Sequence, residues 1–223
     1  MHEDDLEFFA QGLSASETHR YACFARRERQ RQFLLGRMLL RVAVTSLTGL
    51  SPDAFDVIER PGGAPQLMVP AGQCVIPHFS LTHSGDWIGC VVSSNARVGL
   101  DIEVMDPTRD VIVGSRLAFH PEEHVWLLRQ PSSARLSAFY ELWCSREALY
   151  KLMPNLSLEK ASSPLLDGNG AVVYNGFGWH RYSLPRSGLA VIVASDRDLS
   201  VIRQVEIARL RRTDWLPMYS SNR

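Results

Sequence analysis

The chain has 223 residues, of which 45% are hydrophobic and 22% charged, and its 24 basic residues balance its 24 acidic ones. This composition is typical of a globular protein with an ample core, and it excludes a disordered or collagen-like chain. The zero net charge argues against a nucleic-acid binder or a protein of anionic membrane surfaces, since both need a surplus of basic residues.

The N-terminal third predicts a long helix followed by a loop. From Ser16 to about Thr48, apolar residues such as those between Leu34 and Val42 recur every three or four positions, which is one face of a helix. Gly49 ends this helix, and the proline- and glycine-rich stretch at 61–65 breaks any regular structure.

The rest of the chain predicts strands and helices in groups. Three closely spaced strands are expected at 78–82, 87–93 and 98–104, separated by short polar turns. Three helices follow at 110–119, from Pro121 onward, and at 134–152. Further strands are expected at 171–174, 179–184, 189–194 and 201–208. Because helices precede antiparallel strands in each half, the fold class is α+β.

Four cysteines, Cys23, Cys74, Cys90 and Cys144, lie far apart and form no C-x-x-C pair. We expect free, buried thiols in a reducing compartment. The acidic start of the chain is unlike a secretion signal, and its longest apolar stretch near the C-terminus is too short to span a bilayer. These features predict a cytoplasmic protein.

The third predicted strand carries two acids, Asp101 and Glu103. Alternate residues of a strand point to the same face, so both carboxylates lie on one face and Ile102 on the other. Paired carboxylates suit Mg²⁺, which proteins hold through one or two carboxylates with waters and phosphates. From these residues alone, a solvated strand face that happens to carry two acids is the alternative.

The helix predicted at 134–152 carries Glu147 and Lys151, four residues apart and therefore on one face. This order also favours a simple surface ion pair. The functional interpretation makes Glu147 a third metal ligand or a general base, and Lys151 a cation for a phosphate. The chain has 22 arginines and only two lysines, Lys151 and Lys160, so a lysine here is unusual for this sequence.

His83 stands at a strand end beside a tight turn. Its neighbour Ser84 is badly placed to share the hydrogen bond of a hydrolase triad, and the flanks do not match G-x-S-x-G. A phosphate contact and a purely structural histidine are the two interpretations. The stretch H-P-E-E-H at 120–124 matches a zinc-protease signature, but its proline starts a helix and leaves the first histidine as the helix cap.

Seven arginines and one glutamate lie between Arg20 and Arg41. A solvated helix face explains most of this charge. Arginine also offers paired donors to phosphate and carboxylate groups, so the same segment would suit a polyphosphate ligand or an acidic partner.

Taken together, the order of these motifs resembles one family. The sequence is similar to the 4′-phosphopantetheinyl transferases of the surfactin-synthetase-activating (Sfp) type, and especially to their shorter holo-acyl-carrier-protein synthase members. The resemblance covers roughly residues 16 to 205. The matching segments are G-R-M-L-L-R at 36–41, T-H-S-G at 82–85, V-G-L-D-I-E at 98–103, F-H-P-E-E at 119–123 and W-C-S-R-E-A-L-Y-K at 143–151.

The resemblance implies two similar α/β halves packed as a pseudodimer within a monomer, an N-terminal half at 1–96 and a C-terminal half at 97–223. Coenzyme A would lie between them and donate its 4′-phosphopantetheine group to a serine of an apo-acyl carrier protein, or of a carrier domain of a polyketide or nonribosomal peptide synthase. Adenosine 3′,5′-bisphosphate would leave. Fatty-acid or polyketide biosynthesis is the implied context, without nucleic acid or membrane as partner.

The resemblance also implies roles for single residues. The residues implied in binding Mg²⁺ are Asp101, Glu103 and Glu147. Those implied in catalysis are Glu147, as the base for the serine proton, and Lys151 and His83, which would balance phosphate charge. Those implied in contacting coenzyme A are Arg20, Arg31, Thr82, His83 and Lys151.

Three positions depart from the family pattern. Ala64 stands where a phosphate-binding lysine is usual, Arg146 replaces the lysine before the helix glutamate, and residues 152–155 replace a glycine-rich segment. An alternative is therefore a degenerate member that binds coenzyme A or a carrier protein without turnover. A more remote alternative is a metal-dependent phosphohydrolase that uses the same carboxylates.

Overall fold

The structure, a computed structural model, describes residues 3–60, 63–72, 75–154, 165, 179–184 and 186–207. The regular structure in these residues consists of helices and small antiparallel sheets, which confirms the α+β prediction. They form two compact units. The N-terminal unit comprises the described residues of Met1–His78, Val92–Asn95 and Val201–Arg223, and the C-terminal unit those of Phe79–Val91 and Ala96–Ser200.

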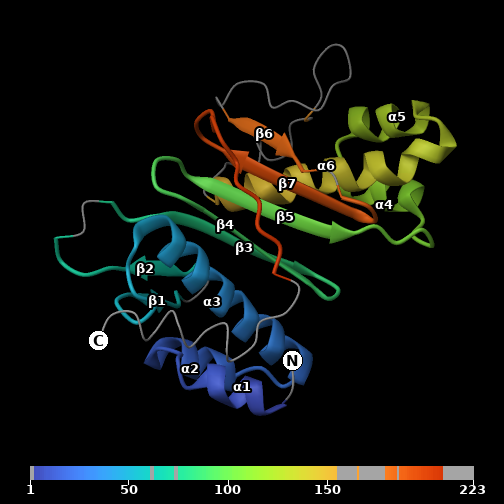
Figure 1. The fold of residues 1–223 in the computed structure, drawn as a ribbon. Coiled ribbons are helices and arrows are strands. Elements are labelled where there is room, and N and C mark those ends of the chain that lie inside the picture. The colour runs from blue at the N-terminus through green and yellow to red at the C-terminus, as the bar shows by residue number, and fades with distance from the viewer. Residues whose placement is uncertain are drawn as a thin grey trace. The chain divides into compact units, whose positions relative to one another are not determined.

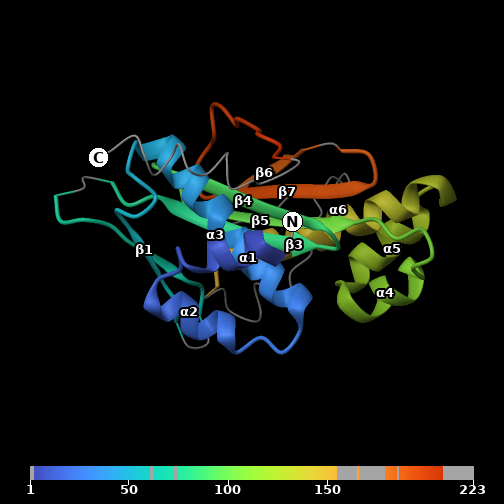
Figure 2. The same ribbon diagram turned by 60° about the horizontal axis from the view of Figure 1, so that its bottom comes forward.

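In the N-terminal unit, helices α1 (Glu3–Ala10) and α2 (Ala15–Ala22) pack against the long helix α3 (Arg27–Thr48), as Figure 2 shows. Strands β1 (Asp56–Ile58) and β2 (Gln66–Met68) form an antiparallel pair. Phe9, Leu34 and Met38 form the buried centre between α1 and α3. Helix α1 and strands β1 and β2 were not predicted from the sequence. The strands have three residues each, which is too short to show a periodic pattern.

The single helix predicted from Ser16 to Thr48 is wrong, since the chain breaks between α2 and α3. Ser14 caps α2, accepting a hydrogen bond from the amide of Glu17, while the side chain of Glu17 accepts one from the amide of Ser14. Arg26, in extended conformation, starts α3. The break lets α2 fold back onto α3, so tertiary packing overrides the continuous helical pattern.

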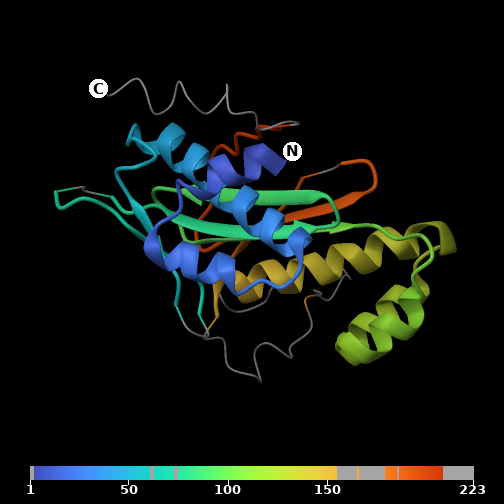
Figure 3. The ribbon, with the colours of Figure 1, turned by 90° about the horizontal axis from the view of Figure 1, so that it is seen from below.

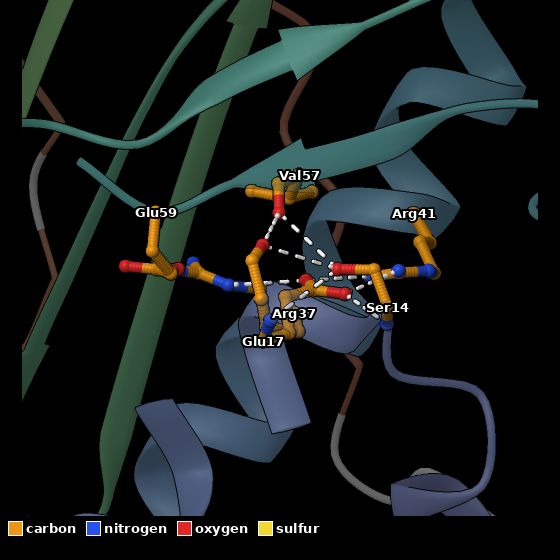
Figure 4. A network of polar contacts seen from close by, with 7 residues as sticks. Ser14, Glu17, Arg37, Arg41, Val57 and Glu59 are labelled. Atoms are coloured by element: carbon orange, nitrogen blue, oxygen red, sulfur yellow. Dashed lines mark hydrogen bonds and ion pairs between the residues drawn. The ribbon is translucent and has the colours of Figure 1, made fainter. Parts of the chain in front are cut away.

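A buried ion cluster joins these helices to β1 (Figure 4). Glu17 is 0% exposed, and Arg41 donates to both of its carboxylate oxygens at 3.1 and 2.7 Å. Arg37 lies with its Nε 3.2 Å from the same carboxylate and also pairs with Glu59. Two arginines of the arginine-rich segment are therefore internal, and removing either partner would leave a buried charge uncompensated.

The C-terminal unit contains two small sheets. Strands β3 (His78–Ser84) and β4 (Trp87–Ser93) form one, and β5 (Val98–Val104), β7 (Leu189–Ser195) and β6 (His180–Ser183) form the other, antiparallel and in that order. Helix α6 (Ser132–Leu152) packs along β5 and β7 (Figures 1 and 3). Helices α4 (Val111–Ala118) and α5 (Pro121–Arg129) pack against each other and against α6.

Most predicted elements of this unit are confirmed. The three strands, the three helices and the cap by His120 are all present, and α6 begins two residues earlier than predicted. Asp110, predicted as the first residue of its helix, is the N-cap of α4. The strand predicted at 201–208 is wrong for the described residues 201–207, which form no strand. Val201 and Val205, apolar residues of the predicted strand, are 80% and 68% exposed, so the alternation forms no buried face. The strand predicted at 171–174 lies outside the described residues.

None of the helices in the described part of the chain is both long and apolar enough to cross a membrane.

Gly99 allows α6 to lie unusually close to β5. A Cβ atom at this position would overlap the carbonyl oxygen of Ala148 and lie 2.8 Å from the amide nitrogen of Leu152. Both obstacles are helix backbone, which cannot rotate away as a side chain does. Asp101, two residues further on the same face of β5, then meets Lys151 of the same helix. The glycine thus sets the distance between the strand acids and the helix.

We expect Gly99→Ala to destabilise the protein by about 3 kcal/mol or more, because overpacking against backbone leaves no room for relaxation. The measurement is chemical denaturation, with Gly89→Ala as the matched control. A Cβ at Gly89 overlaps only side-chain ends, those of Ile102 and Leu100, so its cost should stay within about 1–3 kcal/mol. Equal losses in the two variants would contradict the role assigned to Gly99.

Candidate active site

Asp101 of β5 is the centre of the polar contacts on this face. It is only 5% exposed, so the solvated-face interpretation is wrong for this residue. Its Oδ1 accepts hydrogen bonds from Thr82 Oγ1 at 3.1 Å and from Lys151 Nζ at 2.7 Å. Its Oδ2 is buried and has no hydrogen-bond partner among the described residues. A buried carboxylate oxygen without a partner is costly and indicates a missing ligand.

Lys151 is turned toward β5. Besides Asp101, its ammonium donates to the carbonyl oxygen of Leu100 at 2.9 Å, and its side chain is 27% exposed. Within the described residues its ion-pair partner is therefore Asp101, and the predicted surface pair with Glu147 does not form. The lysine that stood out in composition contributes its charge to the acid cluster.

Glu147 of α6 is half-buried beside these groups. Burial raises the pKa of its carboxyl, the negative charges of Asp101 and Glu103 raise it further, and Lys151 partly offsets them. Asp101 and Glu103 are thus close enough to Glu147 to disfavour its ionisation. A carboxylate with a raised pKa is a stronger proton acceptor, as a general base needs.

Glu103, partly buried, is held by Ser84, which the sequence analysis considered only for a hydrolase triad and rejected. Ser84 Oγ of β3 donates to Glu103 Oε2 at 2.6 Å and accepts from the amide of Val104 at 3.0 Å. A signal was present in the sequence: Ser80, Thr82 and Ser84 place hydroxyls at alternate positions of one strand.

The cysteines agree only in part with the prediction of free, buried thiols. Cys144 of α6 is fully buried, and burial with the nearby charge of Asp101 raises the pKa of its thiol, so it stays protonated and unreactive. Cys90 is half-buried and Cys23 is exposed, so burial was predicted wrongly for Cys23. Cys74 lies outside the described residues.

The three acids have the chemistry that a divalent cation needs, but their side chains are not arranged as a complete metal site. In the described ranges, no three His, Cys, Asp or Glu side chains are arranged to hold a metal ion. The available donors are carboxylate oxygens, including the unpartnered Oδ2 of Asp101, and hard oxygen ligands suit Mg²⁺. A bound cation would also relieve the repulsion that raises the pKa of Glu147.

Other predicted site residues lie elsewhere. His83 is exposed, and as the residue between Thr82 and Ser84 it points from the opposite face of β3. Arg20 and Arg31 are exposed on α2 and α3 of the N-terminal unit. The structure therefore brings together Thr82, Asp101 and Lys151, with Glu103 and Glu147 close by. Arg20 and Arg31 belong to the other unit, and their contact with coenzyme A stays a prediction.

Arg146 is directed to α5. Its Nε and Nη2 donate to Glu123 Oε2 at 3.1 and 2.7 Å, and Glu123 is 0% exposed. The same carboxylate accepts from the amides of His120 and Leu165 at 2.9 and 2.8 Å. Arg146 thus compensates a buried charge that joins α5, α6 and residue 165, which is a structural role that sequence reasoning missed.

Comparison with known proteins points to one family. Residues 97–169, which include β5 and α6, match the model of the 4′-phosphopantetheinyl transferase superfamily. The chain is 32% identical over 142 residues to the 4′-phosphopantetheinyl transferase of Bacillus subtilis (62% of this chain, 59% of the relative). It is 33% identical over 140 residues to 4′-phosphopantetheinyl transferase psf-1 of Bacillus pumilus (62% and 54%). It is 28% identical over 149 residues to 4′-phosphopantetheinyl transferase HetI of Nostoc sp. (67% and 62%). The chain thus spans less than two thirds of the length of each of these relatives.

We expect Glu147→Gln to raise the melting temperature near neutral pH, because it removes a half-buried charge beside Asp101. The pKa of Glu147 is raised in the folded protein, so stability is lost as pH rises above the ordinary pKa of glutamate, and the loss is complete above the folded-state pKa. The gain should be largest at about pH 8 and should shrink as pH falls to about 5, toward the ordinary pKa of glutamate. Thermal unfolding across this range measures it, and the exposed Glu122→Gln should show no such gain. A constant gain at every pH would contradict the electrostatic explanation.

We expect Arg146→Lys to destabilise the protein. A lysine cannot supply both N–H groups to Glu123 Oε2, so one charge-assisted hydrogen bond, worth about 1.5–3 kcal/mol, is lost. Denaturant unfolding measures this loss, with the exposed Arg129→Lys as control. Unchanged stability in Arg146→Lys would show that the Glu123 contact is not a structural requirement.

Proposed function

We propose that this protein transfers the 4′-phosphopantetheine group of coenzyme A to a serine of an apo-carrier protein, because residues 97–169 match the model of the 4′-phosphopantetheinyl transferase superfamily. The observation that carries this proposal is the cluster on β5 and α6, where the buried Asp101 bonds Lys151 at 2.7 Å and where burial and the charge of Asp101 raise the pKa of Glu147. A partly buried carboxyl with a raised pKa beside charged partners is typical of active sites.

Mg²⁺ is the proposed metal, with Asp101, Glu103 and Glu147 as its protein ligands. The unpartnered Oδ2 of Asp101 supports this assignment, since a cation is the ligand such an oxygen lacks. When bound, Mg²⁺ supplies positive charge against the coenzyme A pyrophosphate. Phosphoryl-group transfer depends mainly on such positioning and charge neutralisation.

Glu147 and Lys151 are the residues to which we assign the proton transfer and the balance of phosphate charge. Glu147 accepts the proton of the carrier serine, directly or through a water, as that hydroxyl oxygen bonds to the β-phosphorus of coenzyme A. The bond from this phosphorus to the bridging oxygen breaks, and the electron pair leaves with adenosine 3′,5′-bisphosphate. Lys151 stands beside the acids with a charge that suits the phosphate.

The remaining assignments stay predictions. They are the contacts of His83, Arg20 and Arg31 with coenzyme A, the packing of two halves as a pseudodimer, and the pathway of the carrier. Arg20 and Arg31 are exposed, and a guanidinium pairs well with phosphate, so their chemistry suits the expected contact with the 3′-phosphate.

We expect Asp101→Ala and Glu147→Ala each to lower transfer at least about 100-fold, the effect of losing a general base or a charge-stabilising group. The protein is mixed with coenzyme A, Mg²⁺ and an apo-acyl carrier protein, and the intact mass of the carrier is measured over time. The wild type should add one phosphopantetheine group. Glu122→Ala, an exposed acid of α5, is the control and should transfer as the wild type does.

Each other result has a definite meaning. Coenzyme A binding without a mass gain on several carriers would favour the degenerate binder, which the departures at Ala64 and Arg146 first suggested. Cleavage of coenzyme A without any carrier would indicate a phosphohydrolase. Transfer near the wild-type rate in Asp101→Ala or Glu147→Ala would contradict the roles given to these acids.

A further inference from the structure

A row of three hydroxyls on β3 faces β5. Ser80, Thr82 and Ser84 stand at alternate positions and therefore on the same face of their strand. Ser80 and Thr82 are buried and Ser84 is partly buried. We call these three side chains the β3 hydroxyl row.

Each side chain of the hydroxyl row forms a hydrogen bond with a residue of β5. Thr82 donates to Asp101 Oδ1 at 3.1 Å and Ser84 to Glu103 Oε2 at 2.6 Å, so each acid has one oxygen bonded by a hydroxyl 19 residues before it. Ser80, at the start of the row, accepts from the amide of Leu100 at 3.0 Å and bonds no acid in the part of the chain that the structure describes. The row thus contains two residues that touch carboxylates and one that touches only backbone.

The direction of these hydrogen bonds is fixed by chemistry. A serine hydroxyl has one proton to donate, and an ionised carboxylate only accepts. The amide of Val104 donates to Ser84 Oγ at 3.0 Å, so the proton of Ser84 is free to point at Glu103. Asp101 is held in the same way by Thr82 and by Lys151, both on Oδ1, which leaves the buried Oδ2 without a partner.

We propose that Thr82 and Ser84 are positioning residues, which hold Asp101 and Glu103 in the orientations that bind a divalent cation. This inference rests on the proposed function, and it assigns Thr82 to the strand acid instead of to coenzyme A. Hydrogen bonds to metal-binding carboxylates fix the orientation of the ligand, and their loss weakens metal binding about 10–100-fold.

Ser80 provides a matched control for a purely structural role. Ser80→Ala and Ser84→Ala each remove the acceptor of one β5 amide, at 3.0 Å in both cases, but only Ser84→Ala removes a donor to an acid. The amide bonded by Ser80 is buried, whereas the amide bonded by Ser84 is exposed and can bond water instead. Stability should therefore fall more in Ser80→Ala, and metal binding should fall in Ser84→Ala.

The experiment titrates the full chain with Mn²⁺ alone, followed by electron paramagnetic resonance of the free ion, together with thermal unfolding without metal. We expect Ser84→Ala to raise the dissociation constant about tenfold or more, while Ser80→Ala stays within about twofold of the wild type. Ser84→Thr, which keeps the hydroxyl, should restore binding. Asp101→Ala serves as the variant that loses the site itself.

Three results would overturn the inference. Wild-type affinity in Ser84→Ala, with binding lost in Asp101→Ala, would overturn the positioning role and leave the proposed function intact. Equal weakening in Ser80→Ala and Ser84→Ala would show that the row only joins the two strands. A wild type that binds no Mn²⁺ would overturn the metal assignment of the proposed function, and with it the positioning role.

Discussion

The close approach of β5 and α6 at Gly99 is the constraint on which the candidate site depends. The backbones of the two elements approach so closely there that a Cβ atom on Gly99 would overlap the carbonyl oxygen of Ala148. Two residues along a strand cover about 6–7 Å and one turn of a helix about 5–6 Å. The residue two positions after Gly99 on β5 therefore lies beside the residue about one turn after Ala148 on α6. Asp101 consequently lies next to Lys151, and its negative charge adds to burial in raising the pKa values of Glu147 and Cys144. A wider strand–helix distance would separate these groups.

The cluster beyond this contact combines like charges that would otherwise repel. Lys151 and the hydroxyls of Thr82 and Ser84 compensate part of the negative charge, while burial and its acidic neighbours still raise the pKa of Glu147. Ionised acids held together in a poorly solvated place lower the stability of the apo-protein and increase the affinity for a cation. Stability and the proposed chemistry therefore make opposite demands on the same side chains.

Buried ion pairs elsewhere in the chain have a structural explanation. Glu17 with Arg37 and Arg41, and Glu123 with Arg146, place arginines of recognisable motifs against fully buried glutamates. In both cases the glutamate also belongs to the capping box of a helix, α2 or α5, so one carboxylate caps a helix and binds a guanidinium of another. An arginine-rich segment thus contains residues of two kinds, and the sequence alone does not separate the buried pair from exposed arginines such as Arg20 and Arg31.

The sequence by itself determined the elements that depend on neighbours along the chain. These are the strand at 98–104 with its two acids on one face, the helix that carries Glu147 and Lys151, and the cap at His120. Only the tertiary structure decided the break before α3, the pairing of Lys151 with Asp101 across 50 residues, the partner of Arg146, and the contact between Ser84 and Glu103. Periodicity and capping act within one or two turns, whereas the partner of a charge or hydroxyl depends on which distant segments are packed together, and no local pattern records that.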